Sequence, residues 1–270
     1  MSKLKSRIKN AAKVLLGRVE VAIPIPQVYT KHLCNVCGSS NATFSPLPMY
    51  YLQKRFEHGY VHGYSNAETI NLINFTCNNC QAADRDRLCV LYFDKIRRDL
   101  NGKTISFLDI APTPPLTKYF KKQNEFSIRT ADLYAQGVDD KVDIQNMTIY
   151  EDNKFDAFLC SHVLEHVDDD VAGIKELFRV LKKGGWGIVL APILLELKED
   201  YEVKGILTEE DRWRHYGHWD HRRYYSKSGF VSKLTNCGFK VEQLGIDFFG
   251  KENFEKYAIT NPSVLYVVKK

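Results

Sequence analysis

The chain has 270 residues, of which 44% are hydrophobic and 26% charged, and its formal net charge is +5. This length and apolar content suffice for one substantial core plus a small appendage. No apolar run approaches the roughly 20 residues that a membrane-spanning helix needs, and the N-terminus lacks the apolar core and cleavage site of a signal peptide. We therefore expect a cytoplasmic protein without a transmembrane segment.

The first 18 residues carry six basic side chains and no acidic one, so the rest of the chain is close to neutral. This distribution argues against a protein that coats nucleic acid, because such a protein spreads its basic residues over a binding face. Apolar residues in this segment fall at helical spacing: Leu4, Ile8, Ala11, Val14 and Leu15. Residues 1–30 are thus predicted to hold a basic amphipathic helix. It either lies on a partner or on an anionic membrane, which here means the inner face, or it is a solvated terminal helix.

Two CxxC pairs, Cys34 with Cys37 and Cys77 with Cys80, are separated by 39 residues. In a chain expected to be cytoplasmic, such pairs indicate metal binding before disulfides. Four thiolates in two tight pairs suit tetrahedral structural Zn²⁺, and Gly38 can close the first turn. Reduced free cysteines and a disulfide or redox pair are the alternatives. Catalytic zinc is disfavoured because four thiolates leave no open position.

The segment between the two pairs is predicted to form a loop or short hairpins, too small for a core of its own, so zinc would supply the missing stability. Residues 84–100 place apolar side chains at helical intervals before Asn101-Gly102, which predicts a helix that ends there. We expect the four-cysteine module and its linking helix to occupy residues 31–100, and the remaining domain residues 101–270.

A short apolar strand is predicted at 105–110, leading to the loop of residues 111–115, and the second strand is predicted to end over residues 128–132 at Asp132. Asp132 lies 23 residues after Asp109. At about this spacing, Rossmann-like sites place an acid that accepts hydrogen bonds from ribose hydroxyls. A surface aspartate at a strand end is the alternative interpretation.

Residues 155–192 are predicted to form a strand, a helix that ends at Gly184-Gly185, and a second strand. The loop after the first strand holds Ser161, His162, Glu165 and His166, at the strand end where open α/β sheets place ligands. This unit resembles the class I S-adenosylmethionine (SAM)-dependent methyltransferases, in particular the type 11-like ones. Their fourth strand, its loop and the turn before the fifth strand read almost this way.

The resemblance covers roughly residues 104–270 and implies an α/β fold with a Rossmann-like seven-stranded sheet, preceded here by a small zinc-ribbon-like module. The whole chain resembles a bacterial subgroup, often encoded among surface-polysaccharide genes, that combines a CxxC module with an alanine-proline loop. In most class I members that loop is glycine-rich. The prolines remove amide donors, so the loop cannot present the usual row of N–H groups to the methionine part of SAM.

The resemblance also implies the residues of the SAM site. They follow the strand ends: Asp109, Ala111, Pro112, Thr113, Asp132, Leu133, Asp143, Ile144, Ser161 and His162. Asp143 would accept the exocyclic amine of the adenine, and Ile144 would cover its ring. Glu165 and the aspartates after it can equally serve as caps of the next helix.

Residues 211–226 crowd histidines, arginines and aromatic rings into the segment after the fifth strand, where this fold commonly builds its acceptor pocket. Such side chains can bind a polar ring-shaped acceptor, or they can hydrogen-bond a loop over the sheet. The predicted substrate-binding residues are Arg212, His215, Tyr216, Asp220 and Arg222. A hydroxyl acceptor needs a base, for which His221 is the first choice and His166 and His218 are competitors.

Taken together, the sequence predicts a SAM-dependent O-methyltransferase that acts on a sugar or glycan precursor, either small or lipid-linked, by in-line transfer. A nucleic-acid acceptor is disfavoured by the near-neutral body. The alternatives are an RNA or protein methyltransferase that uses the zinc module as a reader, and a catalytically silent scaffold that recruits partners through that module.

Overall fold

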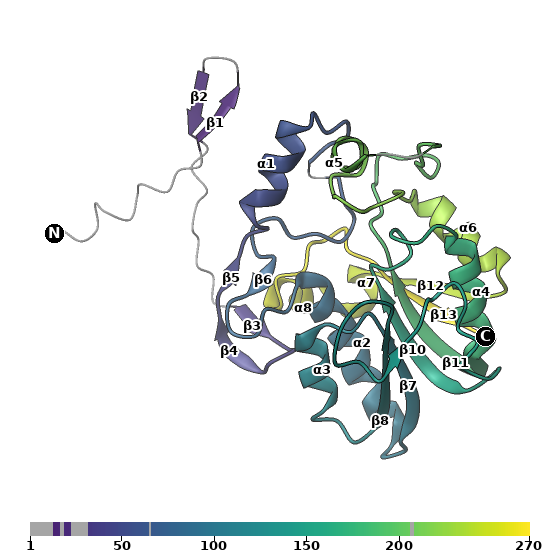
Figure 1. Ribbon diagram of the computed structural model, residues 1–270. Coiled ribbons are helices and arrows are strands. Elements are labelled where there is room, and N and C mark those ends of the chain that lie inside the picture. Colours follow the sequence, from purple (N-terminus) through teal and green to yellow (C-terminus); the bar gives the residue numbers. More distant parts are fainter. Residues whose placement is uncertain (1–12, 17–18, 23–31, 65, 206–207) are drawn as a thin grey trace. The chain divides into compact units, whose positions relative to one another are not determined.

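Buried apolar strands build a seven-stranded sheet, seen in the right-hand half of Figure 1. The computed structural model describes residues 13–16, 19–22, 32–64, 66–205 and 208–270. The strands lie in the order β12-β13-β11-β10-β7-β8-β9. Their bounds are β7 Ile105–Ile110, β8 Phe126–Asp132, β9 Asp140–Lys141, β10 Phe155–Ser161, β11 Leu181–Leu190, β12 Lys240–Leu244 and β13 Leu265–Lys269.

The sheet is parallel from β11 through β10, β7 and β8 to β9, while β13 pairs antiparallel with both β11 and β12. The central strand β10 is apolar over nearly its whole length because helices cover it on both sides. The expected Rossmann-like seven-stranded sheet is therefore confirmed. The carboxyl ends of β7, β8, β10 and β11 meet at one edge, where the polar loops gather.

The two faces of the sheet hold separate groups of aromatic rings. On one face, Phe107 of β7 packs 5.8 Å from Phe93 of α2 (Asp84–Leu100), and Phe120 of α3 (Pro114–Phe120) lies 5.0 Å from both. On the other face, Phe239 lies 6.2 Å from Phe158 of β10 and 5.1 Å from Phe178 of α4 (Asp170–Val180). Adjacent strand residues point to opposite faces, so this alternation fixes which helices cover which side.

The helix after β10 ends earlier than predicted, at Val180, and Gly184 and Gly185 lie inside the ten-residue strand β11. The register between β10 and β11 shifts at this place. Gly184 has φ +76, and a Cβ on Gly185 would come within 2.7 Å of the carbonyl oxygen of Asp156. The glycine pair therefore forms an irregularity in the strand, not a helix end.

The predicted helix over residues 84–100 is confirmed as α2, and it ends as expected at Asn101, which has φ +49. The segment between the CxxC pairs differs from the prediction of loops and hairpins, because it contains helix α1 (Met49–Glu57). None of the residues of α1 is buried. The smaller strands are β3 His32–Cys34, β4 Ser39–Ala42, β5 Phe44–Ser45 and β6 Thr76–Cys77.

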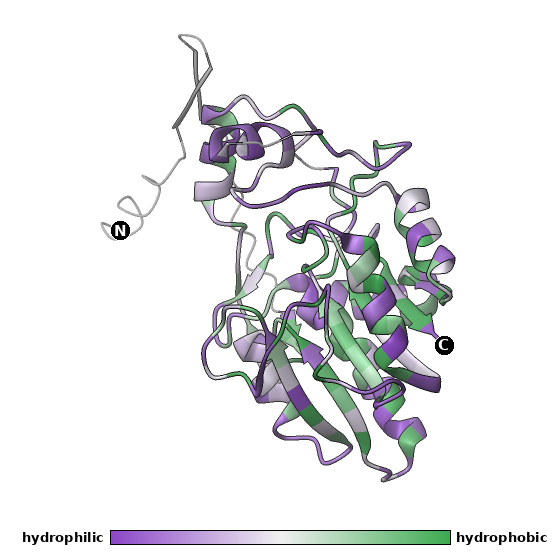
Figure 2. Cartoon of the chain, turned by 45° about the vertical axis from the view of Figure 1, so that its right-hand side comes forward, coloured by the Kyte–Doolittle hydropathy of each residue, from purple (hydrophilic) through white to green (hydrophobic). Residues whose placement is uncertain are grey.

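Three further helices follow β11 before the chain ends, besides the short α7 (Ile246–Phe249). They are α5 Glu209–Tyr216, α6 Lys227–Asn236 and α8 Lys251–Lys256. Figure 2 shows the central strands largely in the hydrophobic colour, while the helices carry both colours. Within the described ranges, no helix combines the length and the apolar character that crossing a bilayer requires.

Residues 1–31 are a unit separate from His32–Lys270. Two strands, β1 (Lys13–Leu16) and β2 (Val19–Ala22), pair antiparallel in it. The predicted amphipathic helix is therefore wrong for Val14 and Leu15, because both lie in β1. Strand formation suits this short run, which is rich in β-branched and apolar residues. Leu4, Ile8 and Ala11, the other residues of that prediction, lie outside the described residues.

Candidate active site and metal centre

The four cysteines of the CxxC pairs come together. One sulfur from each of Cys34, Cys37, Cys77 and Cys80 lies within 4.8 Å of the other three. The Sγ atoms of Cys34 and Cys80 are 3.7 Å apart. Four sulfurs in this arrangement could hold a tetrahedral ion such as zinc.

Matching backbone turns position both pairs. The N–H of Gly38 donates to the carbonyl of Cys34, and that of Gln81 donates to the carbonyl of Cys77, each at 2.8 Å. Gly38 has φ +77 and Gln81 φ +67, so the residue after each pair takes the left-handed conformation. Glycine adopts it without strain, whereas Gln81 does so at a cost that the fold must offset.

A buried arginine lies beside the cysteines. The guanidinium of Arg87, which has no exposed surface, donates to the carbonyls of Phe75 and Ala82 near the second pair and of Tyr257 near the chain's end. A hydrogen bond from the Cys80 thiol lowers the pKa of Cys34 to about 5 against the opposing effect of burial. The positive charge of Arg87 thus lies where thiolates would gather negative charge, and it also ties the module to the C-terminal residues.

Three buried oxygens at the carboxyl ends of β7 and β10 lack hydrogen-bond partners among the described residues. They are Oδ2 of Asp109, Oγ1 of Thr113 and Oγ of Ser161. Burial, with a smaller contribution from the charge of Asp86, raises the pKa of Asp109 to about 8. Unpaired buried polar atoms cost free energy, and a polar ligand at this edge would satisfy them. This is the edge at which the sequence predicts the cofactor.

The loop after β7 is tight despite its lack of glycine. Ala111 takes φ +52, a conformation that favours glycine, and its N–H donates to the carbonyl of Ala131 at 2.8 Å. Pro112 follows, and Thr113 precedes Pro114, which opens α3. The loop therefore keeps the sharp turn that glycines usually make but offers few amide donors, as the sequence predicts.

The other predicted cofactor residues differ in accessibility. Asp132 is partly exposed, and its Oδ1 accepts hydrogen bonds from the N–H groups of Tyr134 and Ala135 at 2.6 Å. Its Oδ2 has no hydrogen-bond partner among the described residues. Leu133 is 44% exposed. The Asp143 carboxylate, in contrast, accepts from Gln145.

Ile144, which the sequence predicts to cover the adenine ring, lies in the main hydrophobic core. The side chain is 4% exposed, belongs to the main core and packs beside Gly173 of α4. In the described structure Ile144 presents no open face to a ring.

Histidines and carboxylates from two distant segments meet next to Ser161. His162 takes φ +56, and its Nδ1 lies 2.9 Å from Oε1 of the fully buried Glu165. Although burial opposes ionisation, the charge and hydrogen bond of His162, with the charge of His166, lower the pKa of Glu165 to about 2. Glu165 is thus held as a carboxylate in the interior. The sequence left its role open between the site and a helix cap.

The predicted base residues lie together around Asp220. Its Oδ2 is 3.0 Å from Nδ1 of His166, and its Oδ1 is 2.5 Å from Nδ1 of His218. The His221 ring stacks on His218 at 4.3 Å and meets His166 edge-on at 4.8 Å. Despite burial, the hydrogen bond to Asp220 and the charge of Glu165 raise the pKa of His166. Burial lowers the pKa of His221 well below its ordinary value.

Three of the predicted substrate-binding residues instead support the fold of the segment. Tyr216 is fully buried, and its hydroxyl accepts a hydrogen bond from the N–H of Val203. His215 pairs with the hydroxyl of Tyr201 at 2.7 Å. Arg212 donates to the carbonyl of His221 at 3.0 Å. Large aromatic and basic side chains serve here because they span the distance between segments and satisfy backbone carbonyls.

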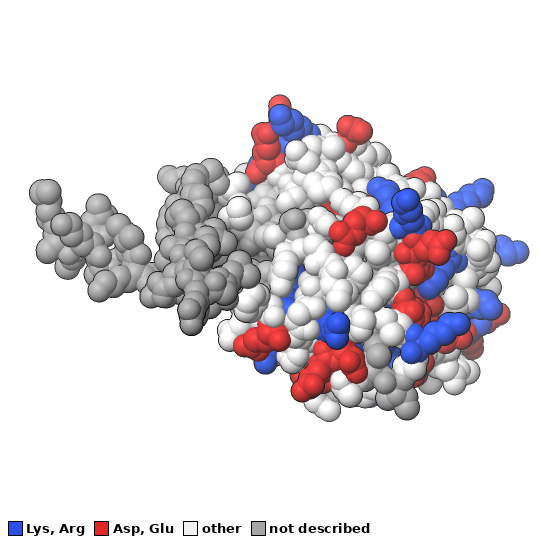
Figure 3. All heavy atoms as spheres, turned by 90° about the horizontal axis from the view of Figure 1, so that it is seen from above, with Lys and Arg blue, Asp and Glu red and all other residues white. Residues whose placement is uncertain are grey.

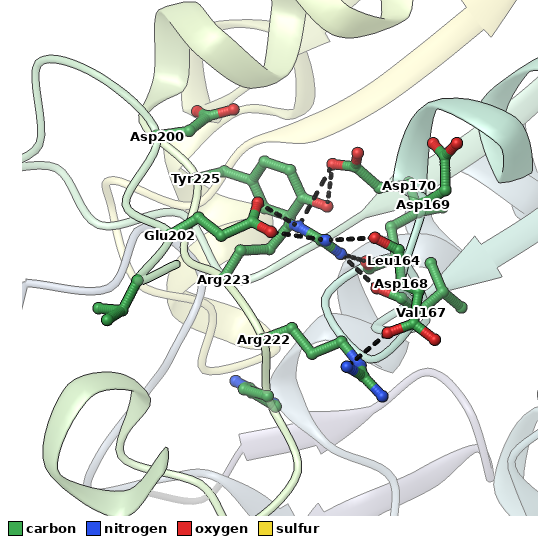
Figure 4. Close-up of polar contacts among 12 residues, drawn as sticks. Leu164, Val167, Asp168, Asp169, Asp170, Asp200, Glu202, Arg222, Arg223 and Tyr225 are labelled. Atoms are coloured by element: carbon green, nitrogen blue, oxygen red, sulfur yellow. Dashed lines mark hydrogen bonds and ion pairs between the residues drawn. The ribbon is translucent and has the colours of Figure 1, made fainter. Parts of the chain in front are cut away.

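Two adjacent arginines fasten the β10–α4 loop, as Figure 4 shows. Arg223 is 2% exposed and donates to the carbonyls of Leu164, Val167 and Asp168 at 2.6–2.9 Å. Arg222 donates to the carbonyl of His166 at 2.9 Å and pairs with the Asp168 carboxylate. The sequence analysis missed Arg223, since no local signal distinguishes it from its neighbour.

Helix α1 also contributes to the site, which the sequence did not predict. The ring of Tyr51 stacks on His218 at 5.8 Å, and Tyr50 meets Trp213 edge-on at 5.7 Å. The guanidinium of Arg55 donates to the carbonyl of Gly217 at 3.2 Å. The segment between the cysteine pairs therefore covers the histidine cluster and depends on the cysteine module for its position.

A cavity of about 570 Å³ lies elsewhere, between α2 and the C-terminal helices α7 and α8. Arginine and lysine side chains of α2 line it together with Phe248, Phe249 and Tyr257. It contains no histidine, cysteine or carboxylate pair that could perform acid–base or metal chemistry. We therefore place the candidate active site at the strand ends and not in this cavity.

Residues 107–189 match the family described as "Methyltransferase domain". The match spans β7, β10 and most of β11, and the sheet carries the antiparallel β13 beside the parallel strands. These residues therefore form a methyltransferase domain of the class I SAM-dependent type. No curated protein matches its sequence.

Solved structures are similar to this chain only distantly. The [4+2]-cyclase SpnF is 15% identical with a TM-score of 0.44, over 84% of this chain and 97% of its own. A SAM-dependent methyltransferase from Archaeoglobus fulgidus is 13% identical with a TM-score of 0.42, over 66% of this chain and 94% of its own. A possible histamine N-methyltransferase from Thermotoga maritima is 18% identical with a TM-score of 0.39, over 69% and 98%. Similarity at this level has no bearing on the acceptor of this methyltransferase.

Proposed function

We propose that this methyltransferase methylates a hydroxyl group of a sugar or glycan precursor, either small or lipid-linked. The observation that carries the proposal is the pairing of His218 with Asp220 at 2.5 Å, beside exposed aromatic rings and next to the strand ends. This arrangement places a base beside surfaces that can bind a ring. A sugar acceptor requires the base for its hydroxyl group and the surfaces for its ring.

The residues at the strand ends fit SAM. When bound, SAM supplies a methyl group activated by its sulfonium. The partly exposed Asp132 would hold the ribose hydroxyls, and the unpaired oxygens of Asp109, Thr113 and Ser161 would take up polar groups of the cofactor. The three oxygens of Asp109, Thr113 and Ser161 are buried and have no hydrogen-bond partner among residues 32–64, 66–205 and 208–270. A bound cofactor with polar groups would give them partners.

His218 suits the role of base better than His221, the first choice from sequence. The Nδ1–H of His218 points to Asp220, so the lone pair is on Nε2, as in catalytic pairs where a carboxylate orients an imidazole. His221 is a poor proton acceptor because burial lowers its pKa well below the ordinary value. The His218 side chain is 21% exposed and can therefore reach an acceptor.

Aromatic rings near His218 support a sugar ring as acceptor. Trp219 is 53% exposed and stacks 5.9 Å from His218, and Tyr50 of α1 is 52% exposed. Such faces pack on the apolar faces of sugars. Basic and acidic side chains are interspersed on the face shown in Figure 3, which is unlike the continuous basic surface of a nucleic-acid-binding protein.

The test is methyl transfer from labelled SAM to a panel of nucleotide-linked and lipid-linked sugars, with product masses to locate the added methyl group. RNA and protein acceptors form a second arm. We expect a methylated sugar with the wild type, at least about 100-fold slower transfer with His218→Gln, and unchanged transfer with His58→Gln. Methylation of RNA or protein instead of any sugar would reject the acceptor, and full activity of His218→Gln would reject the base.

We also propose that the four cysteines bind one structural Zn²⁺. The convergence of four sulfurs and the buried positive charge of Arg87 support this assignment. We expect one zinc ion to remain per chain after dialysis against a weak chelator, and Cys77→Ser to lose it while Cys160→Ser keeps it. Substoichiometric zinc in carefully purified wild type would contradict the assignment.

A further inference from the structure

A buried carboxylate and two imidazoles converge at the carboxyl end of β10, apart from the four cysteines. One ligand atom from each of Glu165, His166 and His221 lies within 4.8 Å of the other two. Glu165 and His166 follow β10, and His221 follows α5, more than fifty residues later in the chain. The two segments are fixed to each other, because the N–H of Arg222 donates to the carbonyl of Glu165 at 2.8 Å.

Two atoms of this cluster are buried and unpaired. Neither Oε2 of Glu165 nor Nδ1 of His221 has a hydrogen-bond partner in the described part of the chain. Glu165 has no exposed surface, so solvent does not compensate the free oxygen. A buried carboxylate with an unused oxygen and a buried imidazole with an unused nitrogen are costly, and one cation between them would satisfy both.

The surrounding hydrogen bonds orient these groups as ligands. The Nδ1–H of His166 points to Asp220 at 3.0 Å, which leaves the lone pair on Nε2, and Nε2 is 3.8 Å from Oε1 of Glu165. His162 donates to Glu165 at 2.9 Å. A carboxylate that holds the far nitrogen of a histidine is the usual support of a metal-binding imidazole.

We propose that Glu165, His166 and His221 bind a divalent first-row transition-metal ion. Two imidazole nitrogens and one carboxylate are a donor set for such ions, and three protein ligands leave positions open for water or an acceptor oxygen. Donor atoms around one ion with bonds of about 2.1 Å lie at most about 4.2 Å apart. His166 Nε2 already lies within this limit of Glu165 Oε1, at 3.8 Å, so the three groups are close to the separation that one ion requires.

A second grouping, His218 with Asp220 and His221, is less suited to an ion. Both oxygens of Asp220 are already used, one by His166 and one by His218. Asp220 therefore supports the ligand His166 and the proposed base His218 at once. If the acceptor is a hydroxyl, which rests on the proposed function, the ion would bind its oxygen and ease loss of the proton to His218.

The test uses the full-length protein, free of any histidine tag and with its four-cysteine site filled with zinc, titrated with Co²⁺ alone. We expect one equivalent to bind and to give visible bands of nitrogen and oxygen ligands, without the near-ultraviolet thiolate bands that exchange at the cysteines would produce. Glu165→Gln, which keeps the side-chain volume, and His221→Ala should abolish this binding. Asp220→Asn should weaken it at least about tenfold, and His58→Ala should leave it unchanged.

Near-ultraviolet circular dichroism and zinc content of each variant show whether it is folded. If His221→Ala does not fold, the Co²⁺ titration of Glu165→Gln alone tests the proposal. Absence of Co²⁺ uptake by the wild type, or equal uptake by folded Glu165→Gln, would overturn the proposal. The titration needs neither SAM nor acceptor. Its failure would therefore leave the proposed methyl transfer intact, whereas Co²⁺ binding without transfer to any sugar would reject only the acceptor.

Discussion

Asp109 allows a quantitative test of the cofactor edge. Its side chain is 1% exposed, burial and the charge of Asp86 raise its pKa from 3.8 to about 8, and Oδ2 has no described partner. The folded state therefore keeps a proton on Asp109 between pH 3.8 and 8 that the unfolded chain has released. Over this window the folded state binds more protons, so the contribution of Asp109 to stability falls as pH rises.

The size of the effect follows from the one proton by which the folded and unfolded states differ. Each pH unit in this window costs about 1.4 kcal/mol, so the free energy of unfolding should lose about 2 kcal/mol between pH 5.5 and 7 through Asp109. Asp109→Asn has nearly the same shape and cannot ionise, so it should lack this loss. Relative to the wild type, the variant should gain about 2 kcal/mol from pH 5.5 to 7.

Urea unfolding of both zinc-loaded proteins at the two pH values measures this difference. Asp156→Asn is the control whose effect should not change between these two pH values. Despite partial burial, hydrogen bonds from Lys182 and Ser106 lower the pKa of Asp156, so its contribution to stability is fully present at both pH values and is lost only at lower pH, as pH falls through the folded-state pKa. A pH-independent difference between Asp109→Asn and the wild type would refute the reasoning about Asp109.

Three other substitutions test the packing by urea unfolding. Ala111→Gly should raise the free energy of unfolding by up to about 1 kcal/mol, because Ala111 has φ +52; a loss of stability would contradict this. Gly187→Ala should cost about 1–3 kcal/mol, because its Cβ would lie 2.2 Å from the Phe158 ring, and a neutral result would show that the ring moves freely. Arg223→Met should cost about 3 kcal/mol or more by leaving three carbonyls unpaired and removing the positive charge beside Asp170 and Glu202, and the account fails if the more exposed Arg222→Met costs as much.

Much of the fold could be predicted because its signals are local. The strands β7 and β10 are largely apolar runs, and α2 carries an apolar stripe closed by Asn101. The glycine pair Gly184-Gly185 misled the prediction, since glycines end helices as readily as they form strand irregularities. The close approach of Gly185 to the Asp156 carbonyl, which decides between them, depends on a partner strand that local sequence does not reveal.

The candidate site was only partly predictable, because its contacts join distant segments. The spacing of the cysteines predicts the four-sulfur cluster, and positions at predicted strand ends identify Asp109 and Asp132 as candidate cofactor residues. Helix α1, in contrast, is held against α5 by aromatic contacts such as Tyr51 with His218, and nothing in its own sequence predicts them. The segment of residues 211–226 mixes site residues with supports, and burial alone separates His218 from Tyr216.

The central claim, that the strand ends of this methyltransferase bind SAM, is tested most directly by calorimetric titration with SAM and with its demethylated product. Asp132→Asn should be titrated in parallel, because the amide oxygen still accepts from Tyr134 and Ala135 while the carboxylate charge is lost. We predict micromolar binding of both ligands to the wild type and at least about tenfold weaker binding to the variant. Folded, zinc-loaded wild type that binds neither ligand, or a variant that binds both equally well, would contradict the account.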